Sequence, residues 1–160
     1  MYIPESSNKT AVIFIGIPAS GKSSFYHRYF SSRFEHINLD SLHTRNKESI
    51  AVGSCIATGK SFVVDNTNPS KKDRERYILI AKEAGYRVIA YFFQSRIKDC
   101  AQRNSQRGRK ARVPDVALAS ISNKLEMPDI TEGFDSIYFV KIMNNGFIVE
   151  PWKDDLQHEF

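Results

Sequence analysis

The sequence contains few cysteines and no long hydrophobic run. Its two cysteines, Cys55 and Cys100, fit no metal-ligand spacing. A disulfide framework is therefore not expected, and a reducing, cytoplasmic compartment is the default. No apolar segment approaches the ~20 residues that span a bilayer, and the opening segment MYIPESSNKT lacks the basic and then apolar pattern of a signal peptide. We expect a cytoplasmic protein with no membrane partner.

Internal repeats, low-complexity tracts and linker-like segments are also absent, which favours a single domain over residues 1–160. Hydrophobic residues make up 41% of the sequence and charged residues 26%, as is typical of a globular protein. The net charge of +5 permits an anionic partner without requiring one. The places where basic residues cluster are therefore more informative than their total.

Short apolar runs alternate with longer segments of helical period, which indicates βαβ units and an α/β fold with a parallel sheet. We expect strands, rich in β-branched and aromatic residues, at Ala11–Ile15, Phe34–Asn38, Ser61–Asp65, Arg87–Phe93 and Ser136–Ile142, with a further short strand possible in the segment GFIVE, Gly146–Glu150. We expect helices at Lys22–Ser31, Ser41–Thr58, Pro69–Ala84, Arg96–Gln106 and Asp115–Leu125. Ligands of such sheets bind beyond the carboxyl ends of the strands.

The segment AVIFIGIPASGKSSF joins the first expected strand to the first expected helix. Gly16–Ser23 fits G-x-x-x-x-G-K-[S/T], a phosphate-binding loop, and this context disfavours a plain glycine turn. Glycine lets a phosphate approach the backbone N–H groups, and the helix N-terminus adds aligned donors. Lys22 would contact the β- and γ-phosphates, and Ser23 a Mg²⁺ ion. The predicted nucleotide-binding residues are Gly16, Ile17, Pro18, Ala19, Ser20, Gly21, Lys22, Ser23 and Ser24.

Two aspartates follow expected strands. Asp40, in INLDSLHTR, lies where an acceptor hydroxyl would meet the γ-phosphate, and a carboxylate there can accept the hydroxyl proton. Helix capping is an equally good account of Asp40 from its position alone. Asp65 ends a hydrophobic strand, where a carboxylate would support Mg²⁺, and Asn66, Thr67 and Asn68 add hydrogen-bonding groups. The alternative for this second group is a polar loop that caps the next helix.

The segment RNSQRGRKAR, from Arg103 to Arg112, holds five basic residues and no acid. Arg103 and Arg107 share a face if this segment is helical, because they are four residues apart. A solvated loop is the plain interpretation of such a run. Its character also matches a mobile basic lid, over roughly residues 104–114, in which guanidinium groups stabilise a transferring phosphoryl group and the loop excludes water.

Taken together, five blocks resemble those of the 5′-hydroxyl polynucleotide kinase family in order and spacing. The blocks are GIPASGKSS, INLD, DNTNPSKKDRERY, RNSQRG and VPDVALASISNKLEMP, and the similarity extends over Ala11–Phe139. The DNTN and RNSQRG blocks are more specific than the phosphate-binding loop, which many kinases, motors and GTPases share. No guanine-reading N-K-x-D motif is present, which argues against a GTPase.

The resemblance implies an adenylate-kinase-like P-loop NTPase fold, with a parallel five-stranded sheet of order 2-3-1-4-5 flanked by helices and covered by a basic lid. It also implies ATP as phosphoryl donor, Mg²⁺ as metal and the 5′-hydroxyl end of DNA or RNA as acceptor. Asp40 would be the general base, and Arg107, assisted by Arg103, would stabilise the transferring phosphate. Asp65 would help to organise the acceptor site, with Thr67 and Asn68 nearby, and would share the metal site with Ser23.

Two departures from the family pattern stand out. The family's phage enzyme has an arginine three residues beyond the general base, where this sequence has His43. Arg45 is a candidate substitute, which we include among the acceptor-binding residues, but only with a shifted helix register. No D-x-D-G-T phosphatase motif occurs in the sequence, so no 3′-phosphatase activity is expected of this chain.

Polynucleotide binding also needs a positive path to Asp40. Lys71, Lys72, Arg74 and Arg76, with the basic lid, either form such a path through phosphate contacts or form an ordinary solvated helix face. Two other functions remain open from the sequence. One is a P-loop kinase of a small-molecule hydroxyl, such as a nucleoside or sugar, and the other is a non-catalytic ATP-binding module.

Overall fold

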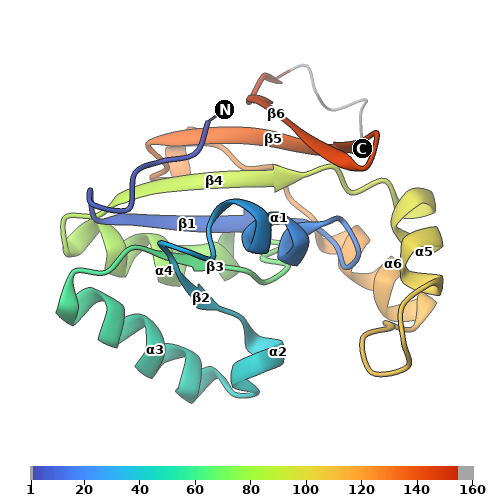
Figure 1. Ribbon diagram of the computed structural model, residues 1–160, viewed down its shortest axis with the longest axis horizontal. Coiled ribbons are helices and arrows are strands. Elements are labelled where there is room, and N and C mark those ends of the chain that lie inside the picture. The colour runs from blue at the N-terminus through green and yellow to red at the C-terminus, as the bar shows by residue number, and fades with distance from the viewer. Residues whose placement is uncertain (1, 155–160) are drawn as a thin grey trace.

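Within residues 2–154, the part of the chain that this computed structural model describes, six strands form one sheet in the order β2-β3-β1-β4-β5-β6 (Figure 1). The first five strands are parallel to one another, and β6 is antiparallel to β5. The strands are β1 (Thr10–Ile15), β2 (Glu35–Ile37), β3 (Phe62–Val64), β4 (Arg87–Phe93), β5 (Ser136–Met143) and β6 (Gly146–Pro151). None of the described helices is long and apolar enough to cross a membrane.

The expected α/β fold and the order 2-3-1-4-5 are therefore confirmed, while the strand number differs by one. β6 covers the GFIVE segment and pairs with β5 through a tight turn at Asn144 and Asn145, whose φ angles are 51° and 61°. Positive φ at both central residues suits a two-residue hairpin, and asparagine tolerates it well. The sixth strand extends the sheet without changing the parallel core.

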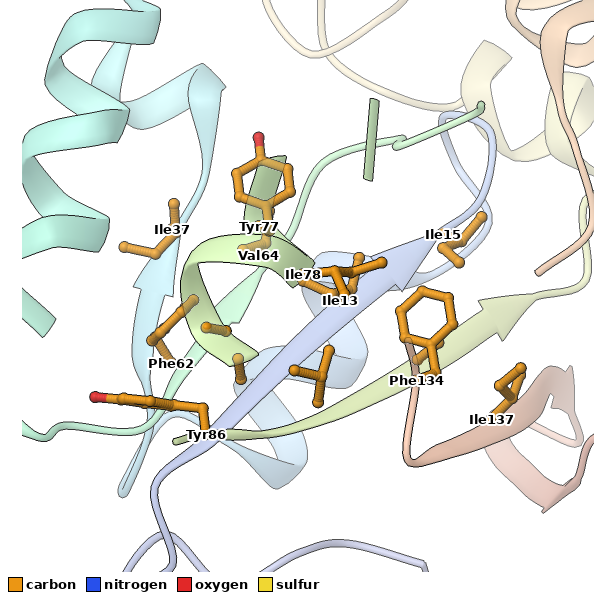
Figure 2. Close-up of a cluster of buried hydrophobic side chains, with 14 of the residues drawn as sticks. Ile13, Ile15, Ile37, Phe62, Val64, Tyr77, Ile78, Tyr86, Phe134 and Ile137 are labelled. Atoms are coloured by element: carbon orange, nitrogen blue, oxygen red, sulfur yellow. The ribbon is translucent and has the colours of Figure 1, made fainter. Parts of the chain in front are cut away.

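Helices cover both faces of the sheet, and apolar side chains fill the space between. On one face, α3 (Arg45–Thr58) and α4 (Lys71–Glu83) pack on alternate residues of the strands, and Figure 2 shows part of this cluster. On the other face, α1 (Lys22–Tyr29) packs Phe25 and Tyr26 against Phe14 and its neighbours. Strands that are buried on both faces explain the nearly continuous apolar runs of the sequence.

The helix expected over Ser41–Thr58 is in fact two helices, α2 (Leu39–Leu42) and α3. His43 ends α2 with φ 70°, and Thr44 caps α3 by accepting a hydrogen bond from the Lys47 N–H. A Thr whose side chain can cap the N–H three residues later favours the start of a helix. Thr44 lies within a segment whose apolar residues have helical spacing on both sides, so the sequence predicts one continuous helix. The break matters because α2 carries Asp40.

Two further helices, α5 (Ile97–Ser105) and α6 (Asp115–Lys124), lie beyond the carboxyl ends of the strands (Figure 1). They contact the phosphate-binding loop through a small cluster of Ile17, Cys100 and Leu118. β1 lies between β3 and β4. The loop after β1 is therefore at the point where the strand order reverses. Open α/β sheets bind their ligands at this point.

Candidate nucleotide and phosphoryl-transfer site

The loop between β1 and α1 is shaped by its two glycines. A Cβ on Gly16 would come 2.6 Å from Ser20 Oγ and 3.0 Å from Phe93 Cβ. Gly21 has φ +99°, and a Cβ there would come 3.0 Å from Ile142 Cδ1. The Gly16 N–H donates to Thr67 O at 3.0 Å, and the Ile17 N–H donates to Ser95 Oγ at 3.1 Å. The loop is thus fixed on both sides by neighbouring strand ends.

The start of α1 fits an anionic ligand. Gly21 provides no side-chain cap, and no acidic residue lies in the first turn. No side chain of α1 itself therefore neutralises the partial positive charge of its N-terminus, and its N–H groups suit phosphate oxygens. This cradle lies within Gly16–Ser24, where the sequence predicts a triphosphate site.

Lys22 is buried and folds back onto the loop. Its ammonium donates to Gly16 O at 3.0 Å and to Ile17 O at 2.9 Å. Burial lowers the pKa of Lys22 from 10.5 to about 8. The negative charges of Asp65 and Asp40 oppose this shift, and the positive charge of Arg107 adds to it.

Ser23 and Asp65 are brought together as predicted for a metal site. Ser23 Oγ donates to Asp65 Oδ2 at 2.8 Å, and Asp65 is buried. Among the described residues, no group of three or more His, Cys, Asp or Glu side chains could hold a metal. A hydroxyl and a carboxylate fit Mg²⁺, because this ion takes few protein ligands and completes its shell with phosphates and water.

His36 on β2 also contacts Asp65, with 2.7 Å between His36 Nε2 and Asp65 Oδ2. The imidazole stacks on Tyr26, with ring centroids 3.9 Å apart. We did not predict this contact, because β2 is short and His36 sits in a weak strand pattern. The available signal was the position of His36 on the strand expected beside the one that ends at Asp65.

The segment after β3 mixes structural and site contacts. Asn68 is buried at φ 45°, and its amide donates to Phe14 O at 2.8 Å, so this side chain fastens the segment to β1. Thr67 contributes its backbone carbonyl to the phosphate-binding loop. Asn66 turns the other way, toward α2 and α3.

Asp40 lies in α2 with its side chain exposed, three residues beyond the end of β2. The helix cap is Asn38, whose Oδ1 accepts from the Ser41 N–H at 3.2 Å. Capping is therefore done by another residue, and the alternative account of Asp40 as the cap is wrong. Asp40 is left with an exposed side chain, and its negative charge opposes the lowering of the Lys22 pKa by burial.

The basic segment begins at the end of α5. Arg103 Nε donates to Ala19 O at 2.7 Å, so this arginine holds the phosphate-binding loop at a residue with φ 65°. Arg107 is exposed in the turn after α5, where its Nη1 donates to Ala111 O at 3.3 Å. Buried Asn104 bonds both N–H and C=O of Val113 and closes the base of this turn. Exposed side chains along it are Arg107, Arg109, Lys110 and Arg112.

Two basic residues have other partners than expected. Arg45 Nη1 donates to Glu48 Oε1 at 3.0 Å and to the Tyr77 hydroxyl at 2.9 Å, with about half of its side chain exposed. Arg74 is fully buried, so its place in a surface path for polynucleotide is wrong. Its guanidinium pairs with both carboxylate oxygens of Glu132, at 2.9 and 3.0 Å, and with the carbonyl of Asn68.

Comparison with known proteins agrees with this site. A protein family described as "AAA domain" matches residues 12–128, which is more than half of the chain. The chain belongs to this AAA domain family. Its members' P-loop fold accounts for the phosphate-binding loop, and ATP as the nucleotide follows from the family.

Curated relatives of this chain confirm its resemblance to the polynucleotide kinase family. A bifunctional polynucleotide phosphatase/kinase of Schizosaccharomyces pombe is 29% identical over 140 residues, 85% of this chain and 34% of that protein. A putative bifunctional polynucleotide phosphatase/kinase of Acanthamoeba polyphaga mimivirus is 32% identical over 147 residues, 84% of this chain and 35% of that protein. The chain spans about a third of the length of these relatives.

Solved structures share the fold at lower identity. A chain of the Pnkp1/Rnl/Hen1 RNA repair complex is 20% identical with a TM-score of 0.62, covering 92% of this chain and 50% of that chain. A gluconokinase of Sinorhizobium meliloti 1021 is 17% identical with a TM-score of 0.59, covering 86% of this chain and 85% of that chain. Because kinases of different acceptors share this architecture, the fold alone does not choose the acceptor.

Proposed function

We propose that this chain is an ATP-dependent kinase that transfers the γ-phosphoryl group to the 5′-hydroxyl end of DNA or RNA. The observation that carries the proposal is the site at the end of β1, where buried Lys22 folds onto the phosphate-binding loop and Ser23 donates to buried Asp65 at 2.8 Å. The sequence similarity to two proteins named polynucleotide phosphatase/kinase supports the choice of acceptor.

The residues of the site divide the work of an in-line transfer. Backbone N–H groups of the loop and the Lys22 ammonium hold the donor phosphates. Asp40 accepts the proton of the attacking hydroxyl, and Arg107 stabilises negative charge on the transferring group. Ser23 and Asp65 would hold Mg²⁺, which when bound neutralises charge on the phosphate oxygens. Arg103 fixes the loop through Ala19.

A polynucleotide also needs contacts away from the reacting hydroxyl. Lys71, Lys72 and Arg76 are exposed on α4, and Arg107 and its basic neighbours are exposed in the turn after α5. Such lysines and arginines bind backbone phosphates without reading sequence. We also assign Thr67 and Arg45 to the acceptor side. Arg45 would use its remaining guanidinium nitrogens, because Nη1 bonds Glu48 and Tyr77.

The function is tested by offering the protein γ-labelled ATP and Mg²⁺ with 5′-hydroxyl DNA and RNA oligomers, 5′-phosphorylated controls, nucleosides and gluconate. We expect label on the 5′-hydroxyl oligomers alone. Label on only the small molecules would replace the proposal with a small-molecule kinase. Nucleotide binding without any transfer would replace it with a non-catalytic ATP-binding module.

The Asp40→Asn variant should lower kcat by at least about 10²-fold, because an amide of the same shape cannot accept the hydroxyl proton. Affinity for ATP should change little, since Asp40 is assigned to the acceptor side. Steady-state kinetics at saturating oligomer measure the loss, and exposed Asp154→Asn is the matched control. Nearly full activity of Asp40→Asn would exclude Asp40 as general base.

Binding of ATP at pH 8 should take up about half a proton, because Lys22 is about half protonated there and the phosphate charges raise its pKa again. At pH 6.5 the free protein already carries this proton, so Lys22 should contribute almost no uptake. Calorimetry in buffers of different ionisation enthalpy measures the proton number. Lys22→Met should show no such uptake at pH 8. Equal uptake by this variant would assign the proton to another group.

A further inference from the structure

Glu48 is a charged side chain that the mechanism above does not use, yet it is almost completely buried. Its side chain is 2% exposed, while Arg45, its ionic partner, is half exposed. Three donors surround the carboxylate: Arg45 Nη1 at 3.0 Å and the Tyr77 hydroxyl at 2.7 Å on Oε1, and Asn66 Nδ2 at 2.8 Å on Oε2. A buried carboxylate is costly unless it is bonded in this way.

Tyr77, one of the donors to Glu48, is fixed by packing in the core. The ring of Tyr77 packs in the apolar cluster beneath α4, and its hydroxyl points away from that cluster (Figure 2). Burial, with Glu48 as hydrogen-bond partner, raises the pKa of Tyr77 to about 12, so the hydroxyl remains a donor at neutral pH. Fully bonded buried networks favour one arrangement of the segments that they join.

Asn66 passes this arrangement on to α2. Its carboxamide is used at both ends, since Nδ2 donates to Glu48 and Oδ1 accepts from the Leu39 N–H at 3.0 Å. The amide cannot rotate by half a turn without placing donors against the Leu39 N–H and an oxygen against the Glu48 carboxylate. Glu48 therefore sets the orientation in which Asn66 can hold Leu39, the residue before Asp40.

The helix α2 has little else to hold it. It is one turn long, and none of its residues is buried. Leu42 is partly buried against the core, and Asn38 caps the helix while donating from Nδ2 to Asp65 O at 2.6 Å. His43 closes α2 at φ 70°, a conformation that side chains rarely adopt without support. The bond from Leu39 to Asn66 thus joins Asn38 in fixing where the helix lies.

We infer that Glu48 and Asn66 are a positioning pair, which holds Asp40 at the distance from the phosphate-binding loop that transfer requires. The inference rests on the proposed function for its effect on rate, and on the contacts alone for its effect on α2. The pair does not bind the donor or the reacting hydroxyl, and it acts on Asp40 through Leu39; Glu48 also bonds Arg45, which we assign to the acceptor side. Misplacement of a reacting group by about 1 Å can cost 10²-fold in rate.

An exchange of the two side-chain chemistries tests the pair. Asn66→Asp places two carboxylates side by side, and Glu48→Gln places two amide groups side by side. Each single variant should therefore lower kcat roughly 10- to 100-fold and leave KM for ATP unchanged. In the double variant the introduced glutamine amide donates to one oxygen of the introduced aspartate, and the other oxygen still accepts from the Leu39 N–H. We expect the double variant to recover most of the lost kcat. Exposed Asn46→Asp and Glu83→Gln are the matched controls.

A second measurement separates this inference from the proposed function. Hydrogen exchange of the Leu39 amide, followed by NMR, should speed up in each single variant and slow again in the double variant. The same pattern in a protein without transfer activity would overturn the proposed function and keep the positioning pair. Wild-type kcat in both single variants, or a double variant no better than the worse single, would overturn the pair. Tyr77→Phe, which removes one donor to Glu48, should speed exchange to a smaller extent.

Discussion

Replacement of Arg107 by alanine is expected to lower kcat by about 10³-fold, the magnitude found for arginines that stabilise a transferring phosphoryl group. In the structure Arg107 lies in an exposed turn and bonds only weakly to Ala111 O, so little holds it away from the site. Its positive charge adds to the lowering of the Lys22 pKa. Arg107→Lys should recover little, because an ammonium lacks the planar fork that binds two oxygens at once.

Single-turnover kinetics at saturating ATP and oligomer measure this loss without a contribution from product release. Exposed Lys98→Ala, on α5 before the basic segment, removes one positive charge from the same region and should leave kcat within about twofold of wild type. If Arg107→Ala and Lys98→Ala lose equal activity, general positive charge and not this guanidinium assists the transfer.

The largest effect on stability is expected at Arg74. Its guanidinium is fully buried and bonds Glu132 through two nitrogens, along with the carbonyls of Asn68, Pro69 and Glu126. Arg74→Met should lower the free energy of unfolding by about 3–5 kcal/mol, because it leaves the Glu132 carboxylate, only 8% exposed, without its partner. Urea unfolding followed by circular dichroism measures this change.

Two further variants complete the Arg74 test. Exposed Lys72→Met on the same helix should change the free energy of unfolding by less than about 0.5 kcal/mol. Adding Glu132→Gln to Arg74→Met removes the unpaired charge and should restore part of the lost stability. A loss below about 1 kcal/mol in Arg74→Met would show that water or another group satisfies Glu132.

The parallel sheet and the phosphate-binding loop could be predicted because their signals are local. Ala11–Ile15 is apolar throughout since β1 is buried on both faces, and the glycines and lysine that follow have fixed spacing. The strand order followed from the family resemblance and not from these runs. β6 was harder to predict, because this edge strand has only half-buried and exposed residues and lacks a long apolar run.

The surroundings of the site were less accessible, because they depend on contacts between distant residues. In the sequence, Arg74 and exposed Arg76 lie in the same basic helix segment. The burial of Arg74 could not be predicted, because it depends on its contact with distant Glu132. Glu48 looks like an ordinary helix glutamate, and its burial follows from Tyr77 and Asn66 on other elements. At His43, with φ 70°, the chain ends α2 and Thr44 begins α3, and Asn66, which is distant in the sequence, bonds the Leu39 N–H of α2.

The most direct test of the central claim is a crystal structure of the protein with a non-hydrolysable ATP analogue, Mg²⁺ and a 5′-hydroxyl oligomer. We expect the triphosphate on the N–H groups at the start of α1 and the terminal 5′-oxygen at about 2.6–3.2 Å from an Asp40 carboxylate oxygen, in line with the γ-phosphorus. A 5′ end bound elsewhere, with Asp40 pointing away from the γ-phosphate, would contradict the account.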